Sequence, residues 1–136
     1  SSLPVSVYAV SLPTPEHLHD TVSISLTYEN GSIATINYFA NGDKSLPKER
    51  IQVFGGGSAA VLDDFRLLSV YAAGKRTDKK LLSQNKGQKT AVHSFIESAW
   101  NGGKAPISFD DLYSTSLTTF AVLESLRTCA PVSLRC

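Results

Sequence analysis

Four polar side chains lie in one segment between two strand-like stretches, and their types are those that bind hydroxyl groups. Residues 40–48 form a long link between a hairpin and the next strand, and they carry Asn41, Asp43, Lys44 and Lys48. Amide, carboxylate and ammonium groups exchange hydrogen bonds with hydroxyls. Binding residues also occur disproportionately on loops held by a rigid scaffold. We therefore interpret the four residues as candidate contacts to a hydroxyl-rich small molecule, and a solvated loop is the alternative.

Three consecutive glycines, Gly55 to Gly57, invite a phosphate-binding interpretation, because backbone N–H groups at a glycine turn can hold an anion. A dinucleotide fingerprint needs spaced glycines between a strand and a helix N-terminus. Residues 58–62 instead continue as a β-type run. We predict a tight turn at these glycines and no nicotinamide-binding site in this chain.

Two histidines, His17 and His19, stand beside Glu16 and Asp20, which is the side-chain chemistry of a Zn²⁺ or Fe²⁺ site. No third His or Cys follows at a recognisable spacing, and two prolines mark the region as a surface connection. We favour a solvated loop and expect no metal. His93 has no nucleophile to serve, so we expect a surface or core-edge role.

Two pairs of adjacent acids have structural explanations. Asp63-Asp64 fits a turn between strands, and Asp110-Asp111 fits the favourable charge at a helix N-terminus. We assign neither pair to acid–base work and expect no catalytic residue in this chain.

Residues 75–89 carry six basic side chains against one acidic side chain, Asp78. A solvated strand pair and helix entrance is the favoured interpretation. Contact with a nucleotide phosphate on another domain is an alternative. Nucleic-acid binding is less favoured, because the segment lacks the interleaved aromatic side chains that stack on bases.

The composition excludes several classes of partner. The net charge is +1, from 13 basic and 12 acidic residues, which gives no general reason to expect nucleic acid or an anionic membrane. No stretch is apolar enough to cross the ~30 Å of a bilayer core. Cys129 and Cys136 match no disulfide framework or metal pair, which suits a reducing cytoplasm. The chain has no methionine, so we expect that residue 1 is not a translation start.

The first part of the chain has the periodicity of strands. Residues 22–28 alternate apolar and polar side chains, and Asn30-Gly31 predicts a two-residue type I′ turn. Pairing outward from that turn sets Tyr28 opposite Ile33. This register places Ile36 and Tyr38 on the reverse face of the hairpin, which we expect to meet another sheet. Further strands are expected at residues 5–11, 49–54, 59–62, 67–72 and 77–82.

Two helices are expected after the strands. Apolar side chains recur at helical spacing between residues 92 and 99, before Gly102-Gly103. Ser108 and Asp111 resemble a capping box ahead of a second helix that runs to about residue 126. Strands first and helices last predict an α+β fold, an open, mostly antiparallel or mixed sheet with the helices packed on one face.

Five segments together carry a resemblance to a known family: ENGSIATINY (29–38), PKERIQVFG (47–55), LDDFR (62–66), Lys86-Gly87 and ESLR (124–127). With these segments the chain resembles the C-terminal domain of the Gfo/Idh/MocA oxidoreductases (glucose-fructose oxidoreductase, inositol dehydrogenase, MocA). The resemblance implies that residues 1–136 are the substrate-side and oligomerisation domain of a two-domain enzyme, whose N-terminal Rossmann domain is absent from this chain.

The resemblance also implies a function for the parent protein. It would be an NAD- or NADP-dependent dehydrogenase of a sugar, nucleotide-sugar or polyol hydroxyl, located in the cytoplasm. This chain would line the substrate cleft with the loop that carries Asn41, Asp43, Lys44 and Lys48. It would also form a homo-oligomer, in particular a dimer, through the sheet face that bears Ile36 and Tyr38. It would bind no cofactor by itself, and neither nucleic acid nor membrane.

Two departures from the family pattern are visible. The chain has no Glu-Lys-Pro motif, whose lysine assists proton transfer in the family. Cys129 stands where similar members tend to have Gly at a helix end, which suggests a strained C-terminus there. A non-catalytic binding or scaffold module of polysaccharide metabolism remains the alternative function.

Overall fold

The computed structural model describes residues 2–13 and 20–134, which form two compact units. Unit 1 comprises Ser1–Gly42 with Ile107–Cys136, and unit 2 comprises Asp43–Pro106. The strands of unit 1 are β1 (Pro4–Ser11), β2 (Thr21–Tyr28), β3 (Ile33–Phe39) and β8 (Val132–Ser133), and its helix is α2 (Phe109–Thr128). The strands of unit 2 are β4 (Arg50–Gly55), β5 (Ser58–Asp63), β6 (Leu67–Ala72) and β7 (Lys75–Lys80), and its helix is α1 (Gln88–Trp100).

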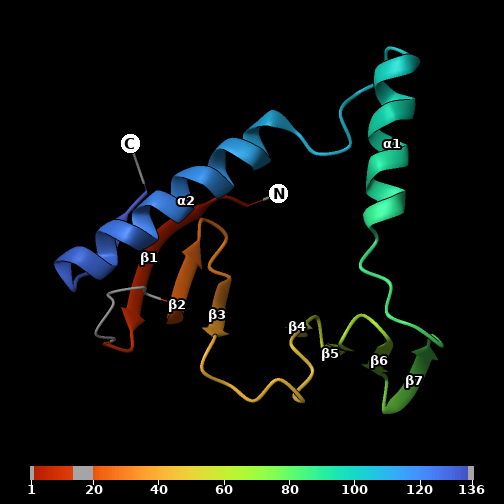
Figure 1. Cartoon of the computed structure of the whole chain (residues 1–136), viewed down its shortest axis with the longest axis horizontal. Helices are drawn as coiled ribbons and strands as arrows, with labels where there is room; N and C mark the ends of the chain where they lie inside the picture. Colours follow the sequence, from red (N-terminus) through yellow and green to blue (C-terminus); the bar gives the residue numbers. More distant parts are fainter. Residues whose placement is uncertain (1, 14–19, 135–136) are drawn as a thin grey trace. The chain divides into compact units, whose positions relative to one another are not determined.

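Unit 1 is an antiparallel sheet in the order β3-β2-β1-β8, with α2 lying along one face over β1 (Figure 1). The core of this unit is small. Val7 of β1 is fully buried, and Leu26 of β2 and Ala121 of α2 are almost so. Because Val7 pairs directly with Leu26, the two side chains share the face that α2 covers.

The hairpin of β2 and β3 has a different register from the one that the sequence suggested. Among the residues described, Gly31 has a positive φ of 80° and Asn30 does not. The N–H of Tyr28 donates to the carbonyl of Ser32 over 2.9 Å, so the loop contains three residues. A type I turn followed by a left-handed glycine forms this loop and changes the pairing by one residue. Ile33 therefore lies opposite Thr27, not Tyr28, and Leu26 lies opposite Ala34.

The corrected register changes which face of β3 each side chain occupies. Ile24 pairs with Ile36 and Val22 with Tyr38, so Ile36 and Tyr38 lie on the face of the sheet that carries α2. The reverse face of β3 carries Ile33 and other side chains at alternate positions. Ile36 is 50% exposed and Tyr38 is 61% exposed, because α2 packs on β1 and β8 and leaves the β3 edge open.

One buried hydroxyl joins α2 to the sheet. Ser125 is 0% exposed, and its Oγ accepts a hydrogen bond from the N–H of Ala9 over 2.9 Å. The same Oγ donates to the carbonyl of Ala130 over 2.7 Å. The short β8 pairs with β1 only at Ser6 and Val7, so Ser125 supplies the acceptor that Ala9 does not find in the sheet.

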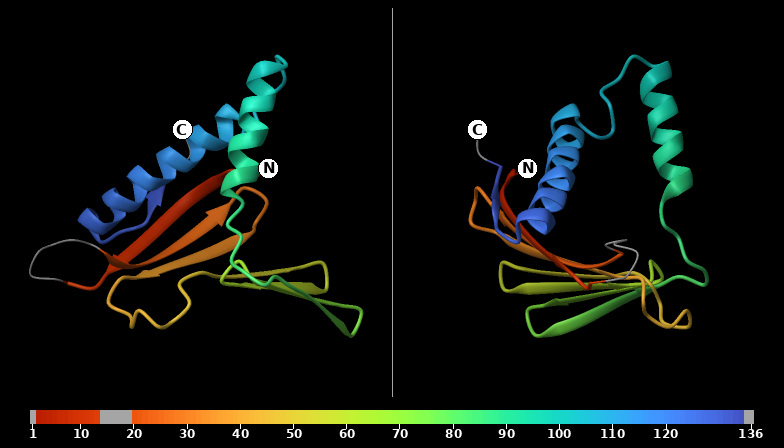
Figure 2. Two further views of the ribbon diagram at one scale, coloured as in Figure 1. Left: turned by 45° about the vertical axis from the view of Figure 1, so that its right-hand side comes forward. Right: turned by 60° about the vertical axis from the view of Figure 1, so that its left-hand side comes forward.

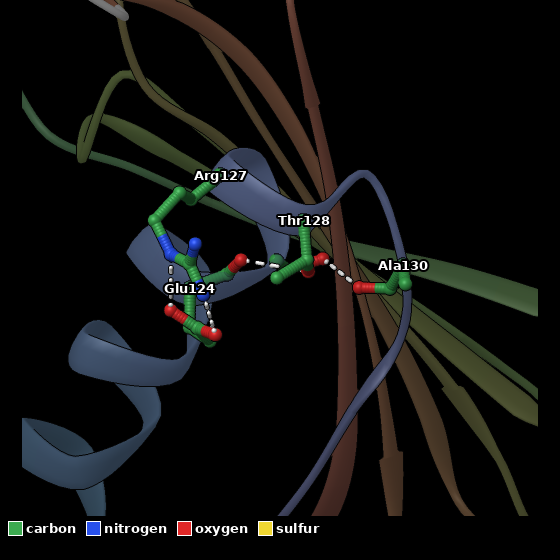
Figure 3. Close-up of polar contacts among 5 residues, drawn as sticks. Glu124, Arg127, Thr128 and Ala130 are labelled. Atoms are coloured by element: carbon green, nitrogen blue, oxygen red, sulfur yellow. Dashed lines mark hydrogen bonds and ion pairs between the residues drawn. The ribbon is translucent and has the colours of Figure 1, made fainter.

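Helix α2 has defined ends. Ser108 caps its N-terminus by accepting the N–H of Asp111 over 3.1 Å, which confirms the capping-box prediction. Its last turn holds the Glu124–Arg127 ion pair at 2.6 Å, and the carbonyl of Ala130, just beyond the helix, accepts a hydrogen bond from this turn (Figure 3). Cys129 ends the helix with a φ of 53°, so the predicted left-handed residue at this position is confirmed.

Unit 2 contains a four-stranded antiparallel meander, β4-β5-β6-β7, seen from two sides in Figure 2. Gly56 and Gly57 both have positive φ and join β4 to β5 directly. This is the two-residue type I′ connection that positive φ at both positions permits. The tight-turn interpretation of Gly55 to Gly57 is therefore confirmed.

Helix α1 has no buried residue. Its apolar side chains Val92, Phe95, Ile96 and Trp100 are all more than half exposed. Its N-cap is Gly87, with a φ of 75°, and no side chain caps the helix there. The side chain of Asn85 instead accepts the N–H of Gly87 over 2.9 Å and fixes the turn into the helix.

The α+β class and the antiparallel strands are confirmed, and the observed strands begin and end close to the predicted ranges. The strands form two four-stranded sheets, where the sequence suggested a single one. No helix in the described ranges has the length and apolar character needed to cross a membrane.

We predict that Ser125→Ala destabilises unit 1 by about 2–4 kcal/mol, because it leaves the buried Ala9 N–H and the Ala130 carbonyl without their partner. A urea titration followed through the NMR signals of β1 measures this loss. Ser116→Ala is the matched control, because Ser116 is an exposed hydroxyl on the same helix and should change stability by less than about 0.5 kcal/mol. Equal effects of the two substitutions would contradict the assignment.

We predict that Cys129→Gly stabilises unit 1 by about 0.5–1 kcal/mol. An L-residue in the left-handed region costs about 1–2 kcal/mol, and part of the gain is lost to the extra freedom of glycine in the unfolded chain. Cys129→Ala is the control, since it removes the thiol and keeps the strained backbone. The same urea titration compares them, and a Gly variant no more stable than the Ala variant would refute the strain.

Candidate functional site

The candidate loop runs from the end of β3 at Phe39 to the start of β4 at Arg50, and residues 41–48 are all exposed. Asp43 organises its middle. The Asp43 carboxylate accepts the hydroxyl of Ser45 over 2.6 Å and the N–H of Ser45 over 2.8 Å. These two bonds lower the pKa of Asp43 below its usual value, the hydroxyl bond having the larger effect. Asp43 is therefore an ionised, pre-oriented acceptor at neutral pH.

The other three candidate residues have free side chains. Asn41, Lys44 and Lys48 make no side-chain hydrogen bond or ion pair within residues 2–13 and 20–134. Lys44 lies in the turn that Asp43 and Ser45 form. The structure thus joins Asp43 to Ser45 and leaves the amide and the two ammonium groups available to a ligand. Their role in substrate binding stays a prediction.

A groove within unit 1, of about 380 Å³, was not found from the sequence. Its floor is apolar and comes from Ile24 and Leu26 of β2 and Ile36 of β3. Its wall is the side of α2 that bears four hydroxyl residues, Ser114, Thr115, Thr118 and Thr119. Apolar clefts with a few convergent polar groups are the usual form of ligand sites.

Three of the four hydroxyls of the groove wall donate to main-chain carbonyls of the same helix. Thr115 donates to the carbonyl of Asp111 over 2.7 Å, and Thr118 donates to that of Ser114 over 2.7 Å. Thr119 does the same to Thr115 over 3.0 Å. Each hydroxyl oxygen keeps acceptor capacity, so the wall offers acceptors above an apolar floor. In the sequence, these four hydroxyl residues are spaced i, i+1, i+4 and i+5, which places them on one side of a helix and could have indicated this wall.

The two acidic pairs lie where the sequence predicts them: Asp63-Asp64 at the turn after β5, and Asp110-Asp111 in the first turn of α2. Asp63 forms an ion pair with Arg50 at 3.5 Å across β4 and β5. Asp64 has a positive φ of 51° in the turn after β5 and accepts a hydrogen bond from Gln84 over 2.8 Å. Asp111 accepts the hydroxyl of Ser108 over 2.6 Å. These acids hold turns and a helix N-terminus.

Part of the basic segment is neutralised inside unit 2. Arg76 donates to Asp78 over 2.7 Å and to Ser69 over 3.3 Å, and its guanidinium lies 5.6 Å from the ring centre of Tyr71. The bond between Arg76 and Asp78 raises the pKa of Arg76 and lowers that of Asp78. Lys86 forms an ion pair with Glu49. These pairs fit the interpretation of a strand pair and a helix entrance.

Of the three histidines, the structure describes His93 alone. His93 lies 3.4 Å from Glu97 on exposed helix surface. In the described ranges there is no cluster of three or more His, Cys, Asp or Glu side chains that would hold an ion. His17 and His19 lie outside those ranges.

Solved structures with the same fold are oxidoreductases of the Gfo/Idh/MocA type. The aldose-aldose oxidoreductase of Caulobacter crescentus, crystallised with glycerol, matches 98% of this chain and 42% of its own, with a TM-score of 0.78 and 18% identity. The UDP-N-acetylglucosamine 3-dehydrogenase of Acidithiobacillus ferrooxidans matches 93% of this chain and 41% of its own, with a TM-score of 0.81 and 15% identity. A levoglucosan dehydrogenase in complex with NADH and L-sorbose has a TM-score of 0.77 at 18% identity, over 98% of this chain and 45% of its own.

These matches confirm the resemblance at the level of the fold. Neither a protein-family model nor a curated protein sequence matches the chain. The chain spans less than half the length of the oxidoreductases that it resembles.

Proposed function

We propose that this chain is the C-terminal, substrate-side domain of an NAD- or NADP-dependent oxidoreductase that acts on a sugar, nucleotide-sugar or polyol hydroxyl. The observation that carries the proposal is the fold, which matches sugar and nucleotide-sugar oxidoreductases over 93% to 98% of the chain. The part of those enzymes that the chain does not span is more than half of each. In this proposal, a Rossmann domain of the longer parent protein binds the cofactor.

The chemistry of the described residues supports a substrate-binding role for this chain and a cofactor-binding role for the rest of the parent protein. Hydride transfer needs donor and acceptor carbons held at near-attack distance, which requires a site for the cofactor. The only run of three glycines joins two strands and does not precede a helix. The residues of this chain therefore supply substrate contacts and support, and the parent supplies the nicotinamide.

The loop from Asn41 to Lys48 is the proposed substrate contact. Asp43 is an ionised acceptor fixed by Ser45. Asn41, Lys44 and Lys48 have exposed side chains with no partner among the residues that the structure describes. A sugar hydroxyl both donates and accepts hydrogen bonds, so a carboxylate beside amide and ammonium groups can satisfy both functions.

We predict that the parent enzyme with Lys44→Ala and Lys48→Ala loses about 10- to 100-fold in kcat/KM, the value of a lost hydrogen bond to a charged donor. Reduction of NAD⁺ or NADP⁺ with panels of aldoses, polyols and UDP-sugars measures the effect. The charge-matched control is Lys79→Ala with Lys80→Ala on β7, which should leave the kinetics unchanged. Normal kinetics in the loop variant would remove the loop from the site.

A non-catalytic scaffold module is the second candidate, and its support is the absence of any identified catalytic side chain among the described residues. The parent protein distinguishes the two. NADH binding and sugar-dependent hydride transfer by the parent support the oxidoreductase, whereas a parent that binds polysaccharide without oxidising any sugar supports the scaffold.

We further propose that the chain self-associates through the open part of the unit 1 sheet, where Ile36 and Tyr38 are exposed. The edge of β3 pairs with no other described strand, and exposed apolar side chains at a free edge favour association. This face is the one that carries α2, as the corrected register requires.

We predict that Ile36→Lys or Tyr38→Lys shifts the sedimentation coefficient toward that of the monomer, because each places a charge in the contact. Ile33→Lys is the control, since Ile33 is 81% exposed on the reverse face of the same strand. Circular dichroism checks that the variants fold. An oligomer that dissociates only with Ile33→Lys would move the contact to the reverse face.

A further inference from the structure

The chain contains three Asn-Gly dipeptides, at Asn30, Asn41 and Asn101. They differ in the hydrogen bonds that surround them. In such a dipeptide the backbone nitrogen of the glycine can attack the asparagine Cγ. Glycine has no Cβ to obstruct this approach. The reaction needs the glycine nitrogen unengaged and the asparagine free to rotate until nitrogen and Cγ meet. Hydrogen bonds at the dipeptide therefore decide how fast it reacts.

Asn30-Gly31 is held on both sides of the reacting atoms. The N–H of Gly31 donates to the carbonyl of Tyr28 over 2.9 Å, so the attacking nitrogen is engaged. The side-chain oxygen of Asn30 accepts the N–H of Ser32 over 3.0 Å, which fixes the amide that must move. The reaction at this site requires the hairpin turn to open first.

Asn101-Gly102 is held by the C-terminal turn of α1. The N–H of Asn101 donates to the carbonyl of Glu97 over 3.0 Å, and the N–H of Gly103 donates to that of Ser98 over 2.8 Å. These two bonds flank the reacting peptide and restrain the rotation that ring closure needs.

Asn41-Gly42 lies in the turn that follows β3, and its side-chain amide is not held. Both residues are exposed, and neither the N–H of Gly42 nor the side chain of Asn41 has a hydrogen-bond partner within the described part of the chain. The nearest fixed points are Ala40, whose N–H donates to Asp20, and the turn that Asp43 forms. The side-chain amide of Asn41 is therefore free to rotate toward the Gly42 nitrogen.

We propose that Asn41-Gly42 is a site of spontaneous deamidation, which slowly changes the charge and the backbone of the loop from Asn41 to Lys48. The Gly42 nitrogen, after losing its proton to solvent hydroxide, forms a bond to Cγ of Asn41. The bond from Cγ to Nδ2 breaks, and ammonia leaves with a proton from water. Water then opens the cyclic succinimide at either carbonyl, giving aspartate or isoaspartate.

The product alters the loop in two ways. The segment carries Lys44 and Lys48 against Asp43, and the new carboxylate cancels this positive excess. Isoaspartate also routes the main chain through the side chain and lengthens it by one carbon. Neither change depends on what the parent protein catalyses, so the modification can be tested separately from the proposed function.

The test incubates the folded chain in mildly alkaline buffer and follows each site by tryptic digestion and fragment mass spectrometry. Residues 1–43 contain no Lys or Arg, so one peptide ending at Lys44 reports Asn30 and Asn41 together, and the peptide 90–104 reports Asn101. We expect Asn41 to convert several-fold faster than the other two. In concentrated urea the three rates should converge, because the protecting hydrogen bonds are lost.

The matched variant is Gly42→Ala, which keeps Asn41 and obstructs the attack. A Cβ at this position would lie 3.7 Å from the carbonyl oxygen of Phe39, an ordinary contact, and Gly42 does not require positive φ, so the variant should fold. It should slow Asn41 several-fold and leave Asn30 and Asn101 unchanged. Equal rates at the three sites in the folded chain, or faster conversion of Asn30 or Asn101, would overturn the proposal.

Discussion

The arrangement of unit 1 depends on the hydroxyl of Ser125. This oxygen accepts the N–H of Ala9 in β1 and donates to the carbonyl of Ala130 beyond the end of α2. It therefore joins the helix, the central strand and the segment that returns to form β8. A hydroxyl is suited to this position, because it is the smallest side-chain group that donates and accepts at once. With the helix fixed over β1, the β3 side of the sheet stays open.

The side chains of α2 that face the sheet are small or hydroxylic, and many of its larger apolar side chains face outward. Ala121 and Ser125 are buried, whereas Phe120 and Leu123 are more than half exposed. Small residues let the helix approach the strands closely, while the hydroxyls along one side form the wall of the groove. The same choice of residues leaves a large apolar area exposed on the helix, which is uncommon on an isolated soluble domain. This area and the exposed apolar side chains of α1 are surfaces that the proposed longer enzyme could cover.

The polar groups of the structure are mostly engaged in holding turns and strands. Asp43, Asp78 and Glu124 have lowered pKa values, and each is explained by a hydrogen bond to a neighbouring side chain: Ser45, Arg76 and Arg127. Under the proposed function, the chain positions a substrate for chemistry performed elsewhere, and this requires only exposed, oriented polar groups. The loop after β3 supplies groups of this kind.

The sequence by itself determined the secondary structure, the α+β class and the resemblance to these oxidoreductases. Strand periodicity, the turn at Gly55 to Gly57, the Ser108 cap and the left-handed position of Cys129 are local features, set by a few neighbouring residues. Only the tertiary structure decided the pairing of β2 with β3, because Asn30-Gly31 is compatible with a two- or a three-residue loop, and one residue of difference moves Ile36 and Tyr38 to the other face. The tertiary structure also decided the groove beside α2 and the two hydrogen bonds of the Ser125 hydroxyl. The groove and the bond to Ala9 join residues more than eighty positions apart, which no local pattern specifies.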